Sequence, residues 1–314
     1  MDLDGHVRLI APLPGEFYLD DIGKDGRVLL GESFPTNSMF ARPAGSAQET
    51  DLYWHDWSSV MDLSPDGKQL LFAEGNDAIY NEPDYVAYLR QTDGSPAVRL
   101  GNGWPSALSP DGKWAMVVPH AQPAQLLALP LHAGVAHALT ADAIHHIAGR
   151  WLPDGQRIVF AGAETGHRVR FYVQDSMQSP ARAISGEDIL FDRNADDIVL
   201  SPDGRLLAAA MQDQSMQLLP VDGGQARPVA GANGLTPVAF CRDGSLLVYR
   251  SGDAPAHIMR VNLQTGTQTL WRDLNPERTG LWGIQPIRVA PDCESYAYSA
   301  QYGPGTAFVV SGLK

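Results

Sequence analysis

The chain has 314 residues, of which 44% are hydrophobic and 19% are charged, and its formal net charge is −13. This is the composition of a globular protein, and no apolar run approaches the roughly 20 residues that span a bilayer, so we expect no membrane span. The acidic balance argues against nucleic acid as a partner, because a nucleic-acid backbone requires a basic footprint.

A short phrase, in which a tight turn separates two apolar runs, recurs along the chain. In chain order it is found at IGKDGRVLL (22–30), LSPDGKQLLF (63–72), LSPDGKWAMVV (108–118), WLPDGQRIVFA (151–161), LSPDGRLLAAA (200–210), FCRDGSLLVY (240–249) and VAPDCESYAY (289–298). Pro presets φ, Asp accepts hydrogen bonds from nearby backbone, and Gly adopts positive φ. Each phrase therefore predicts two antiparallel strands, A and B, joined by a turn.

The turn aspartates recur every 40 to 49 residues, at Asp25, Asp66, Asp111, Asp154, Asp203, Asp243 and Asp292. A second hairpin signal follows within several units, as at 91–100, 219–229 and 262–271, so each unit predicts four short strands. Units of this length indicate propeller blades, each of which is stable only when its neighbours stack against it. We expect an all-β, seven-bladed β-propeller of four-stranded antiparallel blades, forming a single domain over residues 1–314. A six-bladed or open arrangement is the alternative.

The two ends of the chain predict how the ring closes. The last unit supplies strands at 286–290, 295–299 and 306–313, and then lacks a fourth. Residues 6–10 (HVRLI) have the composition of a strand. We therefore expect this N-terminal strand to complete the last blade, which leaves only short, protected sheet edges.

Several phrases resemble one group of proteins, among them DLYWHDWSSVMDLSPDGKQLLFAEG (51–75), YLRQTDGSPAVRLGNG (88–103) and ALSPDGKWAMVVP (107–119). They resemble the C-terminal region of bacterial, notably acidobacterial, serine/threonine protein kinases, which is built of TolB-like, WD40-like (PD40) β-propeller repeats. The likeness covers essentially the whole chain. It implies a sensing or binding module, which is either the C-terminal part of a longer kinase-linked protein or a stand-alone relative.

The chain lacks the motifs that a kinase uses for phosphoryl transfer. There is no glycine-rich loop followed by a V-A-I-K lysine, no H-R-D-x-x-x-x-N and no D-F-G. Because these groups hold ATP and Mg²⁺, this chain is not itself the kinase.

Candidate site residues follow from counting back four positions from each turn aspartate, since these positions should lie at similar heights around the axis. They are Asp21, Asp62, Ala107, Arg150, Val199, Ala239 and Arg288. We expect Asp21 beside Arg288 and Asp62, with loop residues nearby, namely Asp196, Asp197, His145 and His146. The turns themselves are expected on the opposite face. A buried ion-pair network, a ligand pocket and a site for a divalent cation (Ca²⁺ or Zn²⁺) all remain open.

Aromatic side chains and cysteines complete the candidate list. Trp54, Trp57 and Trp104 precede A strands, where they either contact a ligand at the channel mouth or pack between blades. The two cysteines, Cys241 and Cys293, are expected as free thiols, although neighbouring blades could bring them together.

Two functions from different classes follow. The first is a monomeric, non-catalytic module that binds a protein, peptide or small molecule at the channel mouth in association with a bacterial serine/threonine kinase. The second is a metal-dependent hydrolase of the lactonase or phosphotriesterase type, with Asp21, Asp62, Asp197 and His146 as ligands or bases. No signal peptide is expected in this chain, so the location stays open between the cytoplasm and, with an upstream membrane-tethered kinase, the outside.

Overall fold

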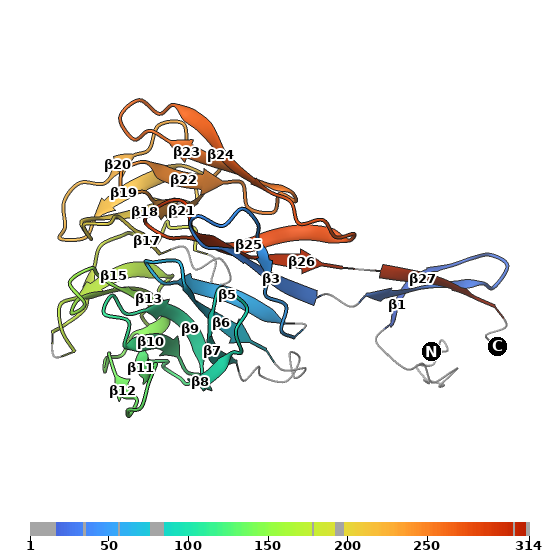
Figure 1. The fold of residues 1–314 in the computed structure, drawn as a ribbon, viewed down its shortest axis with the longest axis horizontal. Helices are drawn as coiled ribbons and strands as arrows, with labels where there is room; N and C mark the ends of the chain where they lie inside the picture. Colours follow the sequence, from blue (N-terminus) through green and yellow to red (C-terminus); the bar gives the residue numbers. More distant parts are fainter. Residues whose placement is uncertain are drawn as a thin grey trace.

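The structure is a computed structural model of the chain, and it describes residues 17–33, 36–55, 57–75, 85–177, 179–191, 198–303 and 305–311. Their strands form seven antiparallel sheets (Figure 1). No helix in these ranges is long and apolar enough to cross a membrane. The expected closing strand at 6–10 lies outside the described residues.

Six of the sheets have four strands each, and we number them as blades in chain order. Blade 1 contains β5 (Ser58–Leu63), β6 (Gln69–Glu74), β7 (Val86–Gln91) and β8 (Val98–Asn102). Blade 2 contains β9 (Trp104–Leu108), β10 (Trp114–Val118), β11 (Leu127–Pro130) and β12 (His137–Ala138). Blade 3 contains β13 (His145–Trp151), β14 (Ile158–Ala163), β15 (Arg170–Gln174) and β16 (Arg182–Ala183).

The remaining three blades continue the series. Blade 4 contains β17 (Val199–Leu200), β18 (Leu206–Ala210), β19 (Met216–Pro220) and β20 (Arg227–Pro228). Blade 5 contains β21 (Thr236–Phe240), β22 (Leu246–Tyr249), β23 (Ala256–Val261) and β24 (Gln268–Leu274). Blade 6 contains β25 (Leu281–Val289), β26 (Tyr296–Tyr302), β3 (Thr36–Arg42) and β4 (Thr50–Asp51).

Apolar clusters between neighbouring blades close the ring. One cluster joins blades 1 to 3, and others join blade 3 to 4, 4 to 5 and 5 to 6. The last cluster packs Met39 and Ala297 of blade 6 against Val60 and Phe72 of blade 1. Because each of the six blades packs both of its faces against neighbouring blades, the core is distributed around the ring rather than lying in one layer.

The expectation of an all-β propeller, with its last blade completed by strands from near the N-terminus, is confirmed. The seventh sheet differs from the expectation in one respect, because it has three strands, β1 (Phe17–Ile22), β2 (Val28–Ser33) and β27 (Gly305–Val310). Figure 1 shows this outer sheet standing away from the ring. The ring therefore has six blades, as in the alternative arrangement given above. The strand expected at 306–313 in the last blade was wrongly placed, because β27 pairs with β2, and β3 takes the place beside β26.

The recurring phrase folds as its residues predict. In blade 1 the Asp66 carboxylate accepts hydrogen bonds from the Ser64 hydroxyl at 2.6 Å and the Lys68 amide at 3.1 Å. The Ser64 hydrogen bond is the main reason that the pKa of Asp66 lies below its ordinary value. Gly67 follows with a φ of 70°, a conformation that glycine adopts without steric cost. The Asp66 carboxylate therefore stabilises its own turn, which is the structural role that the sequence predicts.

A hydrogen-bonded clasp joins the two ends of the chain in blade 6. Glu49, just before β4, accepts hydrogen bonds from the hydroxyls of Tyr296 and Tyr298 on β26, each at 2.7 Å. Both tyrosines are buried. Burial and this carboxylate raise the pKa of Tyr296 to about 12. The tyrosines are therefore neutral donors that hold the N-terminal and C-terminal strands of the blade together.

The two cysteines are not free, contrary to expectation. Cys241 and Cys293 form a disulfide, with their Cα atoms 5.5 Å apart. Each lies in the A–B turn region of its blade, and stacking of blade 5 on blade 6 brings these regions together. The Arg242 amide also donates to the Pro291 carbonyl at 3.1 Å. The disulfide thus links the closing blade covalently to its neighbour.

Candidate functional site

An axial cavity of about 430 Å³ lies where the innermost strands of all six blades converge. The residues four positions before the turn aspartates line it, one from each blade: Asp62, Ala107, Arg150, Val199, Ala239 and Arg288. Counting along the sequence therefore identifies six wall residues of one cavity. Equal spacing from equivalent turns gives equal height because the blades are stacked side by side.

Asp62 connects three blades at the cavity wall. Its Oδ1 accepts a hydrogen bond from Arg150 Nη1 at 2.8 Å, and its Oδ2 accepts one from the Leu108 amide at 2.8 Å. The side chains of Asp62 and Arg150 retain 12% and 17% of their exposure, so the ion pair reaches the cavity but is largely shielded from water. Such shielding makes the pair stronger than a surface ion pair and makes loss of one partner costly.

Arg288 enters the same cavity from blade 6. Its Nε donates to the Met61 carbonyl at 2.6 Å, and its Nη1 donates to the Ile287 carbonyl at 3.0 Å. The first bond joins blade 6 to blade 1, next to Asp62. The charged part of the cavity thus also holds the closing contact of the ring.

The position of Asp21 was wrongly predicted. Asp21 lies on β1 in the outer sheet and is exposed, so it is not beside Arg288 or Asp62. It has the expected spacing from its turn, but its unit is not a blade of the ring. Asp196 and Asp197 lie outside the described residues.

The cavity opens toward the turns, which the sequence interpretation placed on the opposite face. Its rim contains the prolines of five turns and the arginine that replaces proline in blade 5: Pro65, Pro110, Pro153, Pro202, Pro291 and Arg242. A residue four positions before the turn aspartate is only a few residues from the turn, so it lies near the turn end of its A strand. The sequence interpretation missed these rim residues, although counting back one position from each turn aspartate, instead of four, identifies them.

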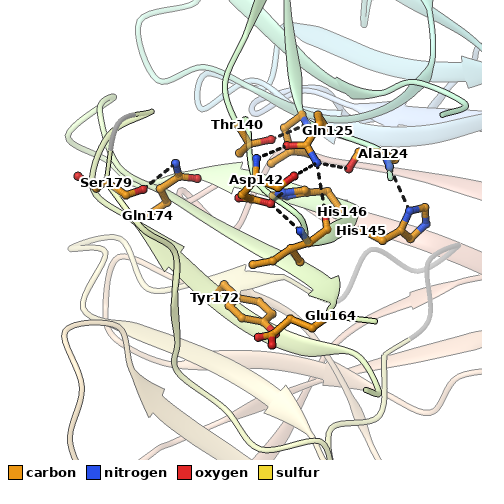
Figure 2. A network of polar contacts seen from close by, with 12 residues as sticks. Ala124, Gln125, Thr140, Asp142, His145, His146, Glu164, Tyr172, Gln174 and Ser179 are labelled. Carbon is orange, nitrogen blue, oxygen red and sulfur yellow. Dashed lines mark hydrogen bonds and ion pairs between the residues drawn. The ribbon is translucent and has the colours of Figure 1, made fainter. Parts of the chain in front are cut away.

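A second pocket, of about 400 Å³, contains three other predicted residues, Trp104, His145 and His146. The His146 ring is completely buried and its Nε2 lies 3.0 Å from Asp142 Oδ1 (Figure 2). Burial lowers the pKa of His146, although the Asp142 hydrogen bond opposes this shift. His145 Nδ1 instead accepts the Ala124 amide at 3.1 Å, so the adjacent histidines serve different structural roles. The sequence interpretation missed Asp142.

The three tryptophans do not share one site. Trp104 is 5% exposed and packs edge-to-face on Tyr85, with ring centroids 4.3 Å apart, in the second pocket. Trp54 lies under Arg90, whose guanidinium is 5.7 Å from the ring centroid. Trp57 forms a bridge with Asn37 of blade 6. Trp54 and Trp57 are not among the wall residues of either cavity.

Within the described ranges, no group of three or more His, Cys, Asp or Glu residues could hold a metal ion. Asp62, the one expected carboxylate that reaches the axial cavity in these ranges, already has both oxygens engaged. The described residues of the cavity thus combine the Asp62–Arg150 ion pair and two further arginines, Arg242 and Arg288, with apolar walls.

Comparison with known proteins identifies the fold. No family model matches the chain, and no curated protein matches it. Among solved structures, the putative TolB from Agrobacterium tumefaciens aligns with a TM-score of 0.63 and 16% identity, over 85% of this chain and 99% of that one. TolB from Acinetobacter baumannii aligns with a TM-score of 0.55 and 15% identity, over 74% and 63%.

A third structure, the Nidogen/Laminin complex, aligns with a TM-score of 0.52 and 10% identity, over 76% of this chain and 94% of the matched chain. The chain has a TolB-like β-propeller fold. At these identities the likeness concerns the fold, since unrelated functions share propeller scaffolds.

Proposed function

We propose that this chain is a non-catalytic binding module that takes a peptide, a protein segment or a small molecule at its axial cavity. The observation that carries the proposal is the convergence of all six blades on one cavity, where the Asp62–Arg150 ion pair sits beside Ala107, Val199 and Ala239. Apolar walls with a few fixed polar groups are typical of ligand sites, because the walls supply affinity and the polar groups fix orientation.

The hydrogen bonds of Asp62 support binding over hydrolysis. A general base needs an oxygen lone pair directed at a substrate proton or at a water molecule. Each oxygen of Asp62 already accepts one hydrogen bond from the wall, Oδ1 from Arg150 and Oδ2 from the Leu108 amide, so the carboxylate is held in a fixed position beside a cation. The metal-dependent hydrolase has no comparable support among the described residues.

The partner we propose is a bacterial serine/threonine protein kinase, to which this module would report the presence of its ligand. The support is the resemblance of the phrases at 51–75, 88–103 and 107–119 to kinase-linked propeller regions. The Nidogen/Laminin complex, which matches this fold, shows a chain of similar architecture within a protein–protein complex. Sequencing upstream in the same reading frame tests the link: a kinase domain supports it, and a stop codon immediately before Met1 contradicts it.

The binding proposal is tested with a displayed library of random peptides, selected on the purified chain. Ala239 lines the cavity and is 8% exposed, so Ala239→Trp fills the site while leaving the ion pair in place. Ala136→Trp, at an exposed position on blade 2, is the matched control. We expect selected peptides to bind Ala239→Trp at least about tenfold more weakly than the control. Equal binding to both variants would show that the cavity is not the site.

Catalysis is tested separately with an ester and a phosphotriester, with divalent metal and with chelator. We expect no turnover that depends on metal and is lost in Asp62→Ala. Turnover that requires metal and is lost in Asp62→Ala would contradict the proposal of a non-catalytic module and support the hydrolase.

A further inference from the structure

A groove of about 940 Å³ runs along the junction of blades 4 and 5, which are neighbours in the ring (Figure 1). Four residues line both this groove and the axial cavity: Ser201, Pro202, Phe240 and Arg242. The groove therefore begins at the rim of the cavity. Its other end reaches Arg227 on β20 and Thr269 on β24, the outermost strands of the two blades.

Arg242 lies where the groove meets the cavity. Its backbone is held on two sides, because the preceding Cys241 is disulfide-bonded to Cys293 and the Arg242 amide donates to the Pro291 carbonyl at 3.1 Å. The side chain is exposed, and within the described part of the chain its guanidinium forms no ion pair or hydrogen bond. A guanidinium on a fixed backbone is suited to bind a carboxylate, because its planar donors match the two oxygens.

The two carboxylates of the groove have other partners. Asp243 Oδ2 accepts a hydrogen bond from Arg260 Nη1 at 2.8 Å, and its Oδ1 accepts one from a serine hydroxyl of its own turn. Asp203 likewise accepts a hydrogen bond from a serine hydroxyl of its own turn, at 2.6 Å. Arg227, at the outer end of the groove, is exposed and forms no ion pair with any described residue.

The groove and the cavity together are locally cationic. The cavity adds Arg150, Arg288 and Asp62 to the charged residues of the groove, so the described walls hold five arginines and three aspartates. The whole chain has a net charge of −13, but charges more than about 8 Å away are largely screened at physiological ionic strength. The nearby arginines therefore determine which charge binds at Arg242, and they favour an anion.

We propose that the ligand of the axial cavity is a peptide that continues into this groove and binds Arg242 through a carboxylate. The inference rests on the proposed function and specifies its ligand. Four adjacent strands, about 4.8 Å apart, make the groove about 14 Å long, which about four extended residues span. Thr269 and Arg260 are cross-strand partners that both line the groove, so its wall offers hydroxyl and guanidinium donors to peptide carbonyls.

The probe is a peptide selected from the displayed library on the wild-type chain, and its affinity is measured by isothermal titration calorimetry. We expect Arg242→Gln to bind it about fivefold more weakly than the wild type. The matched control is Arg250→Gln, which removes an exposed arginine of the same blade that lines neither the groove nor the cavity. This control should bind the peptide as the wild type does.

The peptide is also varied, to identify the carboxylate. It is synthesised with an amidated C-terminus and, separately, with each Asp or Glu replaced by its amide. One of these peptides should bind the wild type about fivefold more weakly, which distinguishes a side-chain carboxylate from the C-terminal one. That peptide should bind the wild type and Arg242→Gln equally, because the carboxylate and the guanidinium act as a pair.

The groove is tested with Thr269→Trp, which obstructs its outer part and should also weaken binding, with Ala136→Trp as the control. Unchanged binding to Thr269→Trp would confine the peptide to the cavity, and equal binding to Arg242→Gln and Arg250→Gln would exclude the carboxylate contact; either result overturns the inference. If Ala239→Trp still weakens binding in these cases, the proposed function stands. If Ala239→Trp has no effect, or the library yields no binding peptide, the proposed function fails as well.

Discussion

The disulfide between blades 5 and 6 allows a quantitative prediction. Replacing both cysteines, as Cys241→Ser/Cys293→Ser, removes a cross-link between residues 52 positions apart. For a loop of this length the chain-entropy model gives a stabilisation of about 4 kcal/mol at 25 °C, because the cross-link restricts the unfolded chain. A chain of 314 residues has an unfolding entropy of about 660 cal/mol/K near its midpoint, so the melting temperature should fall by about 6 °C.

The assay is calorimetry of the wild type and the double serine variant, with free thiols counted before and after denaturation. Cys241 and Cys293 are 2% and 5% exposed, so a water-soluble reductant should leave the bond intact in the folded wild type and reduce it after unfolding. A melting temperature within about 1 °C of the wild type would refute the reasoning that this cross-link stabilises the closed ring.

Three further predictions concern individual side chains. Asp62→Asn keeps the shape of the side chain but leaves Arg150 without its ion pair, and chemical denaturation should show a loss of about 2 kcal/mol. Glu49→Ala deprives two buried tyrosine hydroxyls of their acceptor and should cost about 3 kcal/mol in the same assay, whereas Glu49→Gln, which keeps an acceptor, should cost less. Burial lowers the pKa of His146, so the folded state binds fewer protons than the unfolded chain, and stability should be lost as pH falls through the ordinary value of 6.5. In His146→Phe, the melting temperature should change less with pH between about pH 5.5 and 7.5 than in the wild type. The control His132→Gln, at an exposed position, should show the same pH dependence as the wild type. If the pH dependence in His146→Phe equals that of the wild type, His146 is not its source.

The sequence predicts the parts of this fold that have local causes. The positions of the A and B strands follow from the Pro-Asp-Gly turns, in which hydrogen bonds such as that from Ser64 to Asp66 form within a few residues. The choice of partner for β27 has no local cause. Residues 306–310 have the composition of a strand whichever neighbour they pair with, and in the structure they pair with β2. The number of ring blades therefore could not be read from the repeat alone.

The same distinction explains the outcome for the candidate site. Asp62, Arg150 and Arg288 meet because equivalent positions of stacked blades share a height, which the spacing of the turns reveals. Asp21 has the same spacing but belongs to a unit outside the ring. The Cys241–Cys293 disulfide was missed because it depends on how two adjacent blades are stacked. The sequence of neither turn encodes the distance between the two cysteines.

The most direct test of the account is a crystal structure of the chain with a peptide selected from the displayed library. We expect the peptide in the axial cavity, in contact with Ala239 and with the Asp62–Arg150 pair. A peptide bound at the second pocket or on the outer edge of a blade, with the axial cavity unchanged, would contradict the central claim that the six innermost strands build the binding site.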